Sequence, residues 1–259
     1  ESDGGQSRRP GFETTQFHNG LASRDRWSRS RGQWAAAGGI ILPIPRFTAA
    51  FDENDSVEIV TKPLFPSLVW TTLFDDRAGF NATILKLAYE LRDRDPRGVA
   101  NTNVEGWQSP NILQTLGQFR DVNERIIGIC RKIAESQNFL PDLIYRHQAW
   151  LNISPPGASN KIHVHPNCHL SGVYYVSLSA PECGSIFFRD PRAAATMLRP
   201  PIGKETHFTA TEVRMRPEEG RMYVFPAWLE HGVEINRSDR DRVSISFNIQ
   251  VSERPAPNG

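Results

Sequence analysis

The sequence predicts a mainly β domain of α+β type, an antiparallel sandwich or barrel with two amphipathic helices packed outside it. Two apolar stripes with helical spacing lie before Pro141. Beyond Pro141, short runs of strand-forming residues are separated by Gly and Pro turns, with no helical segment between them. A 259-residue chain with 39% hydrophobic residues can bury the core that such a domain needs.

Residues 1–46 form a basic segment of different composition, rich in Gly, Ser and Arg. Seven Arg against four acidic residues give it a charge of +3, and no helical or strand period persists. Trp27, Trp34 and the run Ile40–Ile44 are candidate anchors, either on a protein partner or on this chain's own domain. We expect an extended basic N-terminal extension over residues 1–56 and a β domain over residues 57–259.

The first elements of the domain are two short strands and two helices. The strands are expected between Val57 and Thr72, around the Lys62–Pro66 turn. The first helix begins near Arg77 and ends before Pro96, and a second helix is expected over Leu116–Ser136. Their apolar stripes are Phe80, Ile84, Leu87 and Leu91 in the first, and Val122, Ile126, Ile129 and Ile133 in the second.

The β region contains seven candidate strands, and their spacing indicates an antiparallel arrangement. They are residues 145–153, 162–165, 171–178, 185–189, 207–213, 221–225 and 243–251.

Histidines suggest a metal site in this region. Residues i and i+2 of a strand share a face, so His163 and His165 are expected to project together. His231, which follows the strand ending at Phe225, is the third candidate ligand. Imidazole is the commonest side-chain metal ligand. His169 is expected in a turn and is not a candidate.

A carboxylate-binding pair is expected close to these histidines. Arg242 and Ser244 share a strand face, and a guanidinium fork with a hydroxyl beside it suits a carboxylate. Asn152 and Tyr174 are further candidates to line this pocket, whereas Trp150 and Tyr175 are expected in the core.

The order of these motifs resembles the 2-oxoglutarate/Fe(II)-dependent oxygenase superfamily, and within it a family found in bacteria, phages and some algae. The resemblance extends over about Leu64–Val251. It implies a double-stranded β-helix (a jelly roll, cupin-like) with Fe(II) at its mouth and 2-oxoglutarate as cosubstrate. The motifs that carry it are residues 163–165, HVH; 170–176, LSGVYYV; 184–192, GSIFFRDPR; 225–228, FPAW; His231; and 242–248, RVSISFN.

Carried over, His231 is the distal iron ligand, and Arg242 with Ser244 holds the far carboxylate of 2-oxoglutarate. The superfamily's usual triad contains one carboxylate. This chain offers His163-Val-His165 or His165-Pro-Asn167 instead. Three interpretations follow: a three-histidine iron site, a site with Asn167 or water as a weak ligand, or a scaffold that has lost its metal. We favour His163, His165 and His231, with Asn167 as the alternative ligand.

Two functions follow from these observations. The first is a dioxygenase that hydroxylates a small-molecule or protein substrate. The second is a catalytically silent subunit of a larger assembly, anchored by its N-terminal extension. The missing carboxylate fits it, and the joint retention of the HxH pair, His231 and the Arg242–Ser244 pair opposes it. A sugar-binding jelly roll without metal would leave the histidines dispersed.

Composition narrows the partners and the compartment. A net charge of +1 gives no electrostatic reason to expect nucleic acid binding, and no apolar run approaches the roughly 20 residues of a membrane span. Three cysteines without paired spacing argue for a reducing, intracellular compartment. Because the chain starts at Glu1, an organelle reached after removal of a leader is the second expectation.

Overall fold

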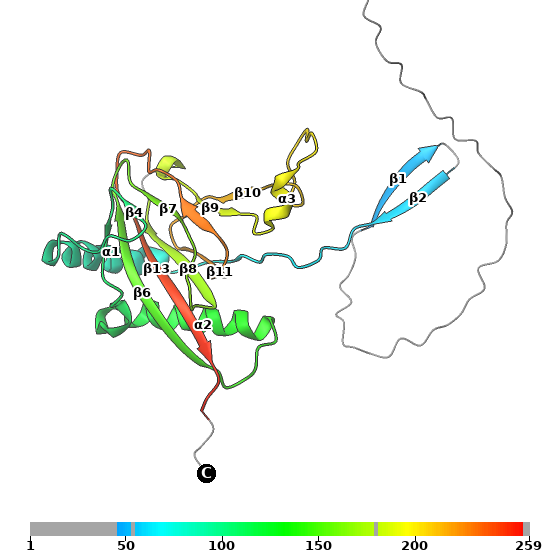
Figure 1. Cartoon of the computed structure of the whole chain (residues 1–259). Helices are drawn as coiled ribbons and strands as arrows, with labels where there is room; N and C mark the ends of the chain where they lie inside the picture. Colours follow the sequence, from blue (N-terminus) through cyan, green and yellow to red (C-terminus); the bar gives the residue numbers. More distant parts are fainter. Residues whose placement is uncertain (1–45, 53–54, 179–180, 256–259) are drawn as a thin grey trace, which may run out of the picture. The chain divides into compact units, whose positions relative to one another are not determined.

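A computed structural model describes residues 46–52, 55–178 and 181–255 of the chain (Figure 1). The chain divides into two units after Pro63. The first contains an antiparallel hairpin of β1 (Arg46–Asp52) and β2 (Asp55–Val60). The candidate anchors Trp27, Trp34 and Ile40–Ile44 lie outside the described residues, so the role of the extension and its division at residue 56 stay predictions.

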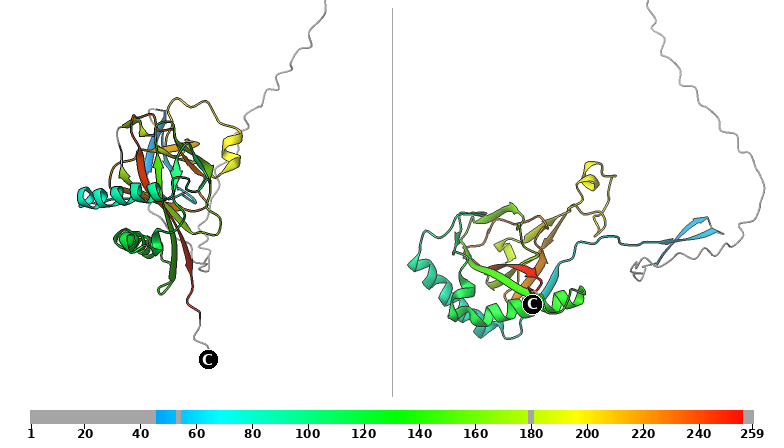
Figure 2. Two further views of the ribbon diagram at one scale, coloured as in Figure 1. Left: turned by 90° about the vertical axis from the view of Figure 1, so that its left-hand side faces the viewer. Right: turned by 60° about the horizontal axis from the view of Figure 1, so that its bottom comes forward.

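The second unit is a jelly roll of two antiparallel sheets, as predicted (Figures 1 and 2). One sheet has six strands, in the order β3 (Trp70–Leu73), β11 (Arg221–Pro226), β8 (Leu170–Ser177), β13 (Arg242–Ser252), β6 (Ile144–Ser154) and β5 (Trp107–Gln108). The other has five, in the order β10 (Glu212–Met215), β9 (Ile186–Arg189), β12 (His231–Val233), β7 (Ser159–His163) and β4 (Asn103–Val104).

Two helices cover the outer face of the six-stranded sheet, which confirms the predicted arrangement (Figure 1). They are α1 (Arg77–Arg94) and α2 (Arg120–Ser136). The second predicted helix begins later than expected, because a separate 3-10 turn occupies its first residues. The short helices are η1 (Leu113–Thr115), η2 (Gly117–Phe119), η3 (Pro181–Cys183) and α3 (Ala193–Met197).

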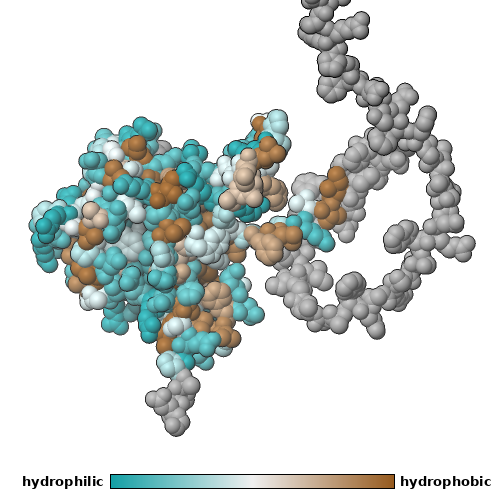
Figure 3. Space-filling view, viewed as in Figure 1, coloured by the Kyte–Doolittle hydropathy of each residue, from teal (hydrophilic) through white to brown (hydrophobic). Residues whose placement is uncertain are grey.

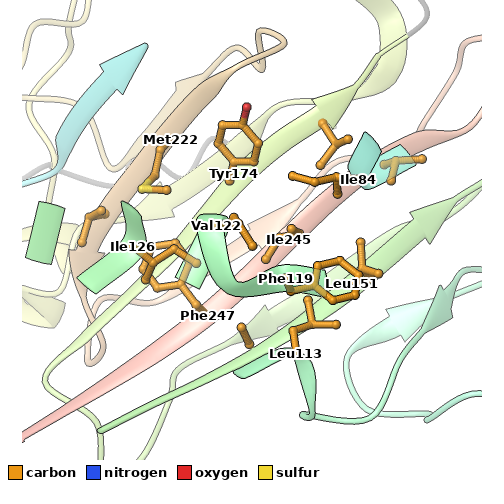
Figure 4. Close-up of a cluster of buried hydrophobic side chains, with 14 of the residues drawn as sticks. Ile84, Leu113, Phe119, Val122, Ile126, Leu151, Tyr174, Met222, Ile245 and Phe247 are labelled. Carbon is orange, nitrogen blue, oxygen red and sulfur yellow. The ribbon is translucent and has the colours of Figure 1, made fainter. Parts of the chain in front are cut away.

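The main core lies between these helices and the sheet (Figure 4). Strand alternation builds it: Val243, Ile245, Phe247 and Ile249 of β13 are buried in this core. The residues between them in sequence face the other sheet, which leaves that face of β13 free to carry polar groups. A smaller apolar cluster, which includes Phe188 and Phe225, lies on that inner side.

Further predictions differ from the observed structure, and the short helix α3 lies in a region that was expected to contain no helix. The strand expected over residues 207–213 begins only at Glu212, because a turn closed by Ala210 N–H donating to Thr206 O precedes it. Two-residue strands β4 and β5 occupy what was expected to be a loop. The face seen in Figure 3 is mostly hydrophilic with scattered apolar residues. No helix in the described ranges is both long and apolar enough to cross a bilayer.

Candidate metal and carboxylate site

A cavity between the two sheets brings together most of the predicted site residues. The five-stranded sheet contributes His163 and His231, and His165 follows directly after β7. The six-stranded sheet contributes Asn152 from β6 and, from β13, Arg242 with Ser244. The cavity therefore has imidazoles on one wall and a guanidinium with polar groups on the other.

The three histidines form a compact cluster. One potential ligand atom from each of His163, His165 and His231 lies within 4.8 Å of the other two. His163 and His231 are direct partners in the antiparallel pair of β7 and β12, and their ring centroids are 4.3 Å apart. His165 is held by its backbone N–H, which donates to Ala227 O at 2.9 Å. The cluster has the geometry of a metal site.

Hydrogen bonds orient two of these rings with the same nitrogen toward the cavity. Nδ1–H of His163 donates to Lys161 O at 2.7 Å, and Nδ1–H of His231 donates to Leu229 O at 2.8 Å. A ring that donates from Nδ1 keeps Nε2 unprotonated, and an unprotonated nitrogen is what a metal requires. Both histidines therefore offer Nε2.

Burial keeps the cluster in the neutral, metal-binding form. Desolvation lowers the pKa of His163, and it lowers the pKa of His165 to about 4 and that of His231 to about 3. The neighbouring imidazoles act in the same direction on His165 and His231, because two positive charges so close together repel. At neutral pH all three rings are uncharged ligands.

The cluster includes no acidic side chain of the described ranges. Asn167, the alternative ligand, is exposed in a turn with φ of 63° and does not line the cavity. His169 is also exposed, and its Nδ1 accepts from Val251 N–H instead. The geometry therefore favours the His163-Val-His165 register over His165-Pro-Asn167.

Arg242 is a buried cation without an acidic partner among the described residues. Arg242 is 2% exposed, and this burial lowers the pKa of its guanidinium. Nη1 donates to Cys183 O and, at 3.3 Å, to Glu234 O, whereas Nη2 has no partner in the described structure. Gly184, at φ of 87°, makes room for the guanidinium: a Cβ there would lie 2.9 Å from Nη1. The free Nη2 suits an anion.

The prediction for Tyr174 was wrong. On β8 it faces α1, where its hydroxyl donates to Asn81 Oδ1 at 2.5 Å, and it packs in the helix-side core. The adjacent Tyr175 lines the cavity instead, and its buried hydroxyl has no partner among the described residues. The cause is strand parity: Tyr175 pairs with Ser244, while Tyr174 pairs with Ile245.

Trp150 is buried in the core, as predicted, and it also lines the cavity. Its ring centroid lies 6.0 Å from that of His165. The sequence contained a signal for Trp150. It is two residues from Asn152 on one strand, so it shares a face with a residue predicted to line the pocket.

With this geometry established, comparison with known proteins shows what the chain is similar to. Residues 148–248 match the family model "Putative 2OG-Fe(II) oxygenase". This segment runs from β6 to β13 and contains all three histidines and Arg242. The resemblance to the 2-oxoglutarate/Fe(II) oxygenase superfamily is thereby confirmed. No curated protein sequence matches the chain.

Solved structures with a similar fold include α-ketoglutarate-dependent enzymes. The α-ketoglutarate-dependent epimerase SnoN of nogalamycin biosynthesis has a TM-score of 0.54 at 14% identity, over 74% of this chain and 81% of its own. A SnoN complex with Fe3+, α-ketoglutarate and nogalamycin RO has a TM-score of 0.53 at 15% identity, over 73% and 82%. A Pseudomonas putida prolyl-4-hydroxylase has a TM-score of 0.50 at 14% identity, over 71% and 93%. At such identities the likeness establishes the jelly-roll fold.

Proposed function

We propose that this protein is an Fe(II)- and 2-oxoglutarate-dependent dioxygenase that hydroxylates a C–H bond of its substrate. The observation that carries the proposal is the placement of Arg242 in the same cavity as the histidine cluster. A buried cation without a counterion is costly, and an anionic ligand removes that cost. A dicarboxylate could bind Arg242 with one carboxylate and reach the metal held by the histidines with its other end.

His163, His165 and His231 would hold the iron. Three neutral imidazoles form a donor set suited to a divalent first-row metal, and the cluster is compact enough for one ion. Three protein ligands leave coordination positions free, and bound Fe(II) would supply there the activation of O2 that the reaction requires. The chain's own contribution is to keep the rings neutral and oriented.

Arg242, Tyr175 and Ser244 would hold the far carboxylate of 2-oxoglutarate. Arg242 Nη2 and the Tyr175 hydroxyl are buried donors without a partner in the described structure. Ser244 lies two residues from Arg242 and pairs across the sheet with Tyr175, so the three groups share one face. A carboxylate placed there would accept from a guanidinium and from a hydroxyl, which are charge-assisted hydrogen bonds.

Asn152 has a lesser role in this proposal. Its Nδ2 donates to Ser246 Oγ at 3.0 Å, and its Oδ1 is buried without a donor among the described residues. It can accept a hydrogen bond from a bound ligand or from a water molecule in the cavity. Asn152 would therefore line the cosubstrate pocket without neutralising its charge.

The overall reaction consumes one O2 and one 2-oxoglutarate per substrate. One oxygen atom enters the C–H bond to form an alcohol, and the other enters succinate as 2-oxoglutarate loses CO2. The two-electron oxidation of the substrate and that of the keto acid together reduce O2 fully, so no further reductant is needed.

The silent-subunit alternative rests on the extension, whose residues 1–45 lie outside the described structure. The converging histidines and the unpaired Arg242 favour the enzyme, because a scaffold without a ligand gains nothing from a buried, unpaired cation. The same convergence opposes a metal-free sugar-binding jelly roll, for which dispersed histidines were expected.

Turnover of 2-oxoglutarate without added substrate tests the proposal. The protein reconstituted with Fe(II) and supplied with O2 should form succinate slowly, and the His231→Ala variant should form none above background. Lys86→Ala, an exposed change on α1, is the matched control and should keep the wild-type rate. Loss of 2-oxoglutarate at the same rate in wild type and His231→Ala would contradict the assignment.

A further inference from the structure

Asn248 contacts His165. Among the described residues, the Nδ1 atoms of His163 and His231 have backbone carbonyl partners, whereas the Nδ1 of His165 has none. The Nδ2 of Asn248 lies 3.2 Å from Nδ1 of His165, and its buried Oδ1 has no donor among the described residues. Asn248 lies on β13, on the same face as Arg242 and Ser244, with β6 and β8 paired on either side. The backbone that carries this amide is therefore held in the centre of the sheet.

The contact allows two hydrogen-bonding arrangements. If Nδ2 donates to Nδ1 of His165, the neutral ring carries its proton on Nε2, and Nε2 cannot bind a metal. If the amide is rotated by half a turn, Oδ1 accepts from Nδ1–H and leaves Nε2 unprotonated. In either orientation one polar atom of the amide is buried without a hydrogen-bond partner, so the hydrogen bonds of Asn248 alone do not distinguish the two arrangements. The tautomer of His165 that the metal site requires distinguishes them.

The other two rings show which tautomer that is. His163 and His231 both donate from Nδ1 to a backbone carbonyl and present Nε2 to the cavity. A site of three Nε2 atoms needs the same arrangement at His165, and Asn248 Oδ1 is the acceptor in contact with its Nδ1. We infer that Asn248 is a positioning residue that accepts the Nδ1–H of His165 and so completes a metal site built from three Nε2 atoms.

This inference rests on the proposed function, since it assigns Asn248 a part in holding the iron. Hydrogen-bond partners of ligating histidines fix the ring and its tautomer, and their loss typically lowers metal affinity by about 10- to 100-fold. Asn248 would act through His165 and would touch neither the metal nor the cosubstrate.

The first test needs no variant and no metal. Long-range 1H–15N spectra of the histidine rings in metal-free wild-type protein report which nitrogen carries the proton. The expected result is Nδ1–H with an unprotonated Nε2 at all three histidines. A His165 ring protonated at Nε2, with Nδ1 as acceptor, would overturn the inference.

Variants provide the second test, with Co(II) as the probe and its dissociation constant as the readout. Asn248→Leu removes the acceptor and should weaken Co(II) binding by about 10- to 100-fold. Asn248→Asp keeps only acceptors and should bind Co(II) as tightly as wild type or more tightly. Gln250→Leu, an exposed change two residues further along β13, is the matched control and should leave binding unchanged.

The outcomes separate the two claims. If wild type binds Co(II) and Asn248→Asp loses as much affinity as Asn248→Leu, the amide acts as a donor and the inference is wrong. Unchanged binding in Asn248→Leu would also refute it. If wild type does not bind Co(II), the proposed function fails, and the ring spectra still decide the tautomer of His165. Those spectra also serve if Asn248→Leu does not fold.

Discussion

The two faces of the six-stranded sheet come from the same strands but differ in chemistry. Toward the helices, β13 presents Val243, Ile245 and Phe247, all buried in an apolar core. Figure 4 shows Ile245 and Phe247 in this core. Toward the other sheet, the alternate residues Arg242, Ser244 and Ser246 line the cavity. Because side chains alternate along the strand, residues that stabilise the fold and residues that line the cavity alternate within β13. Substitutions at two neighbouring positions are therefore expected to affect different properties, stability at one and ligand binding at the other.

The largest expected effect is on the cavity face. Arg242→Met should lower 2-oxoglutarate affinity of the metal-loaded protein by at least about 100-fold, since losing one partner of a buried charge pair costs roughly 3–5 kcal/mol. The Tm of the metal-free protein should not fall, because methionine fills the space without an unpaired buried charge. Calorimetric titration and thermal unfolding measure the two effects.

Arg214→Met is the control for Arg242→Met. This exposed arginine pairs with Glu212 and Glu234 on the outer surface, so its loss should leave 2-oxoglutarate affinity unchanged. Equal affinity losses in both variants would show that the Arg242 effect is not specific to the cavity.

The helix face should respond in the opposite way. Phe247→Ala leaves a void in the core and should lower the free energy of unfolding by about 3–5 kcal/mol. Under conditions where the variant remains folded, its Co(II) affinity should match wild type. Urea unfolding followed by circular dichroism measures the first effect. A variant of full stability would show that the apolar face is less tightly packed than its burial indicates.

Two adjacent tyrosines sharpen the comparison at smaller scale. Tyr175→Phe removes a hydroxyl from the carboxylate pocket and should weaken 2-oxoglutarate binding by about 10- to 100-fold, since hydrogen bonds to charged groups contribute roughly 1.5–3 kcal/mol. Tyr174→Phe loses the bond to Asn81 and should cost about 1 kcal/mol of stability with unchanged 2-oxoglutarate affinity. Weaker 2-oxoglutarate binding in Tyr174→Phe, with no change in Tyr175→Phe, would show that the pocket lies on the helix-facing side of the sheet and would contradict the assignment.

The last expected effect appears only below neutral pH, in the pH dependence of the stability of the metal-free protein. The folded-state pKa values of His165 and His231 lie below the ordinary value of 6.5, at about 4 and about 3, so below pH 6.5 the unfolded chain binds more protons. Stability should therefore fall as the pH drops from about 6.5 toward about 4, by up to about 1.4 kcal/mol per pH unit for each histidine. His231→Gln should reduce this slope in urea unfolding curves, and an unchanged slope would contradict burial as its cause.

Local patterns predicted much of this arrangement. The stripe Phe80, Ile84, Leu87 and Leu91 predicted α1, and the i and i+2 spacing of His163 and His165 predicted that they would project together. These features depend on neighbours in sequence. β12 was not predicted, because a three-residue strand carries too little pattern to distinguish it from a loop.

Features set by pairing between distant strands could not be predicted in the same way. Tyr174 and Tyr175 are both plausible pocket residues from sequence, and only their partners on β13 decide which one faces the cavity. Asn248, the proposed acceptor for His165, lies on a strand 83 residues further along the chain, so no local motif connects the two residues.

Anaerobic titration of the Fe(II)-loaded protein with 2-oxoglutarate tests the central claim most directly, because a weak visible charge-transfer band appears only when the keto acid binds the iron. Wild type should take up one equivalent of iron and develop the band at stoichiometric 2-oxoglutarate, whereas Arg242→Met should bind iron without developing it. A wild-type protein that takes up no iron, or that shows the same band with Arg242→Met, would contradict the account.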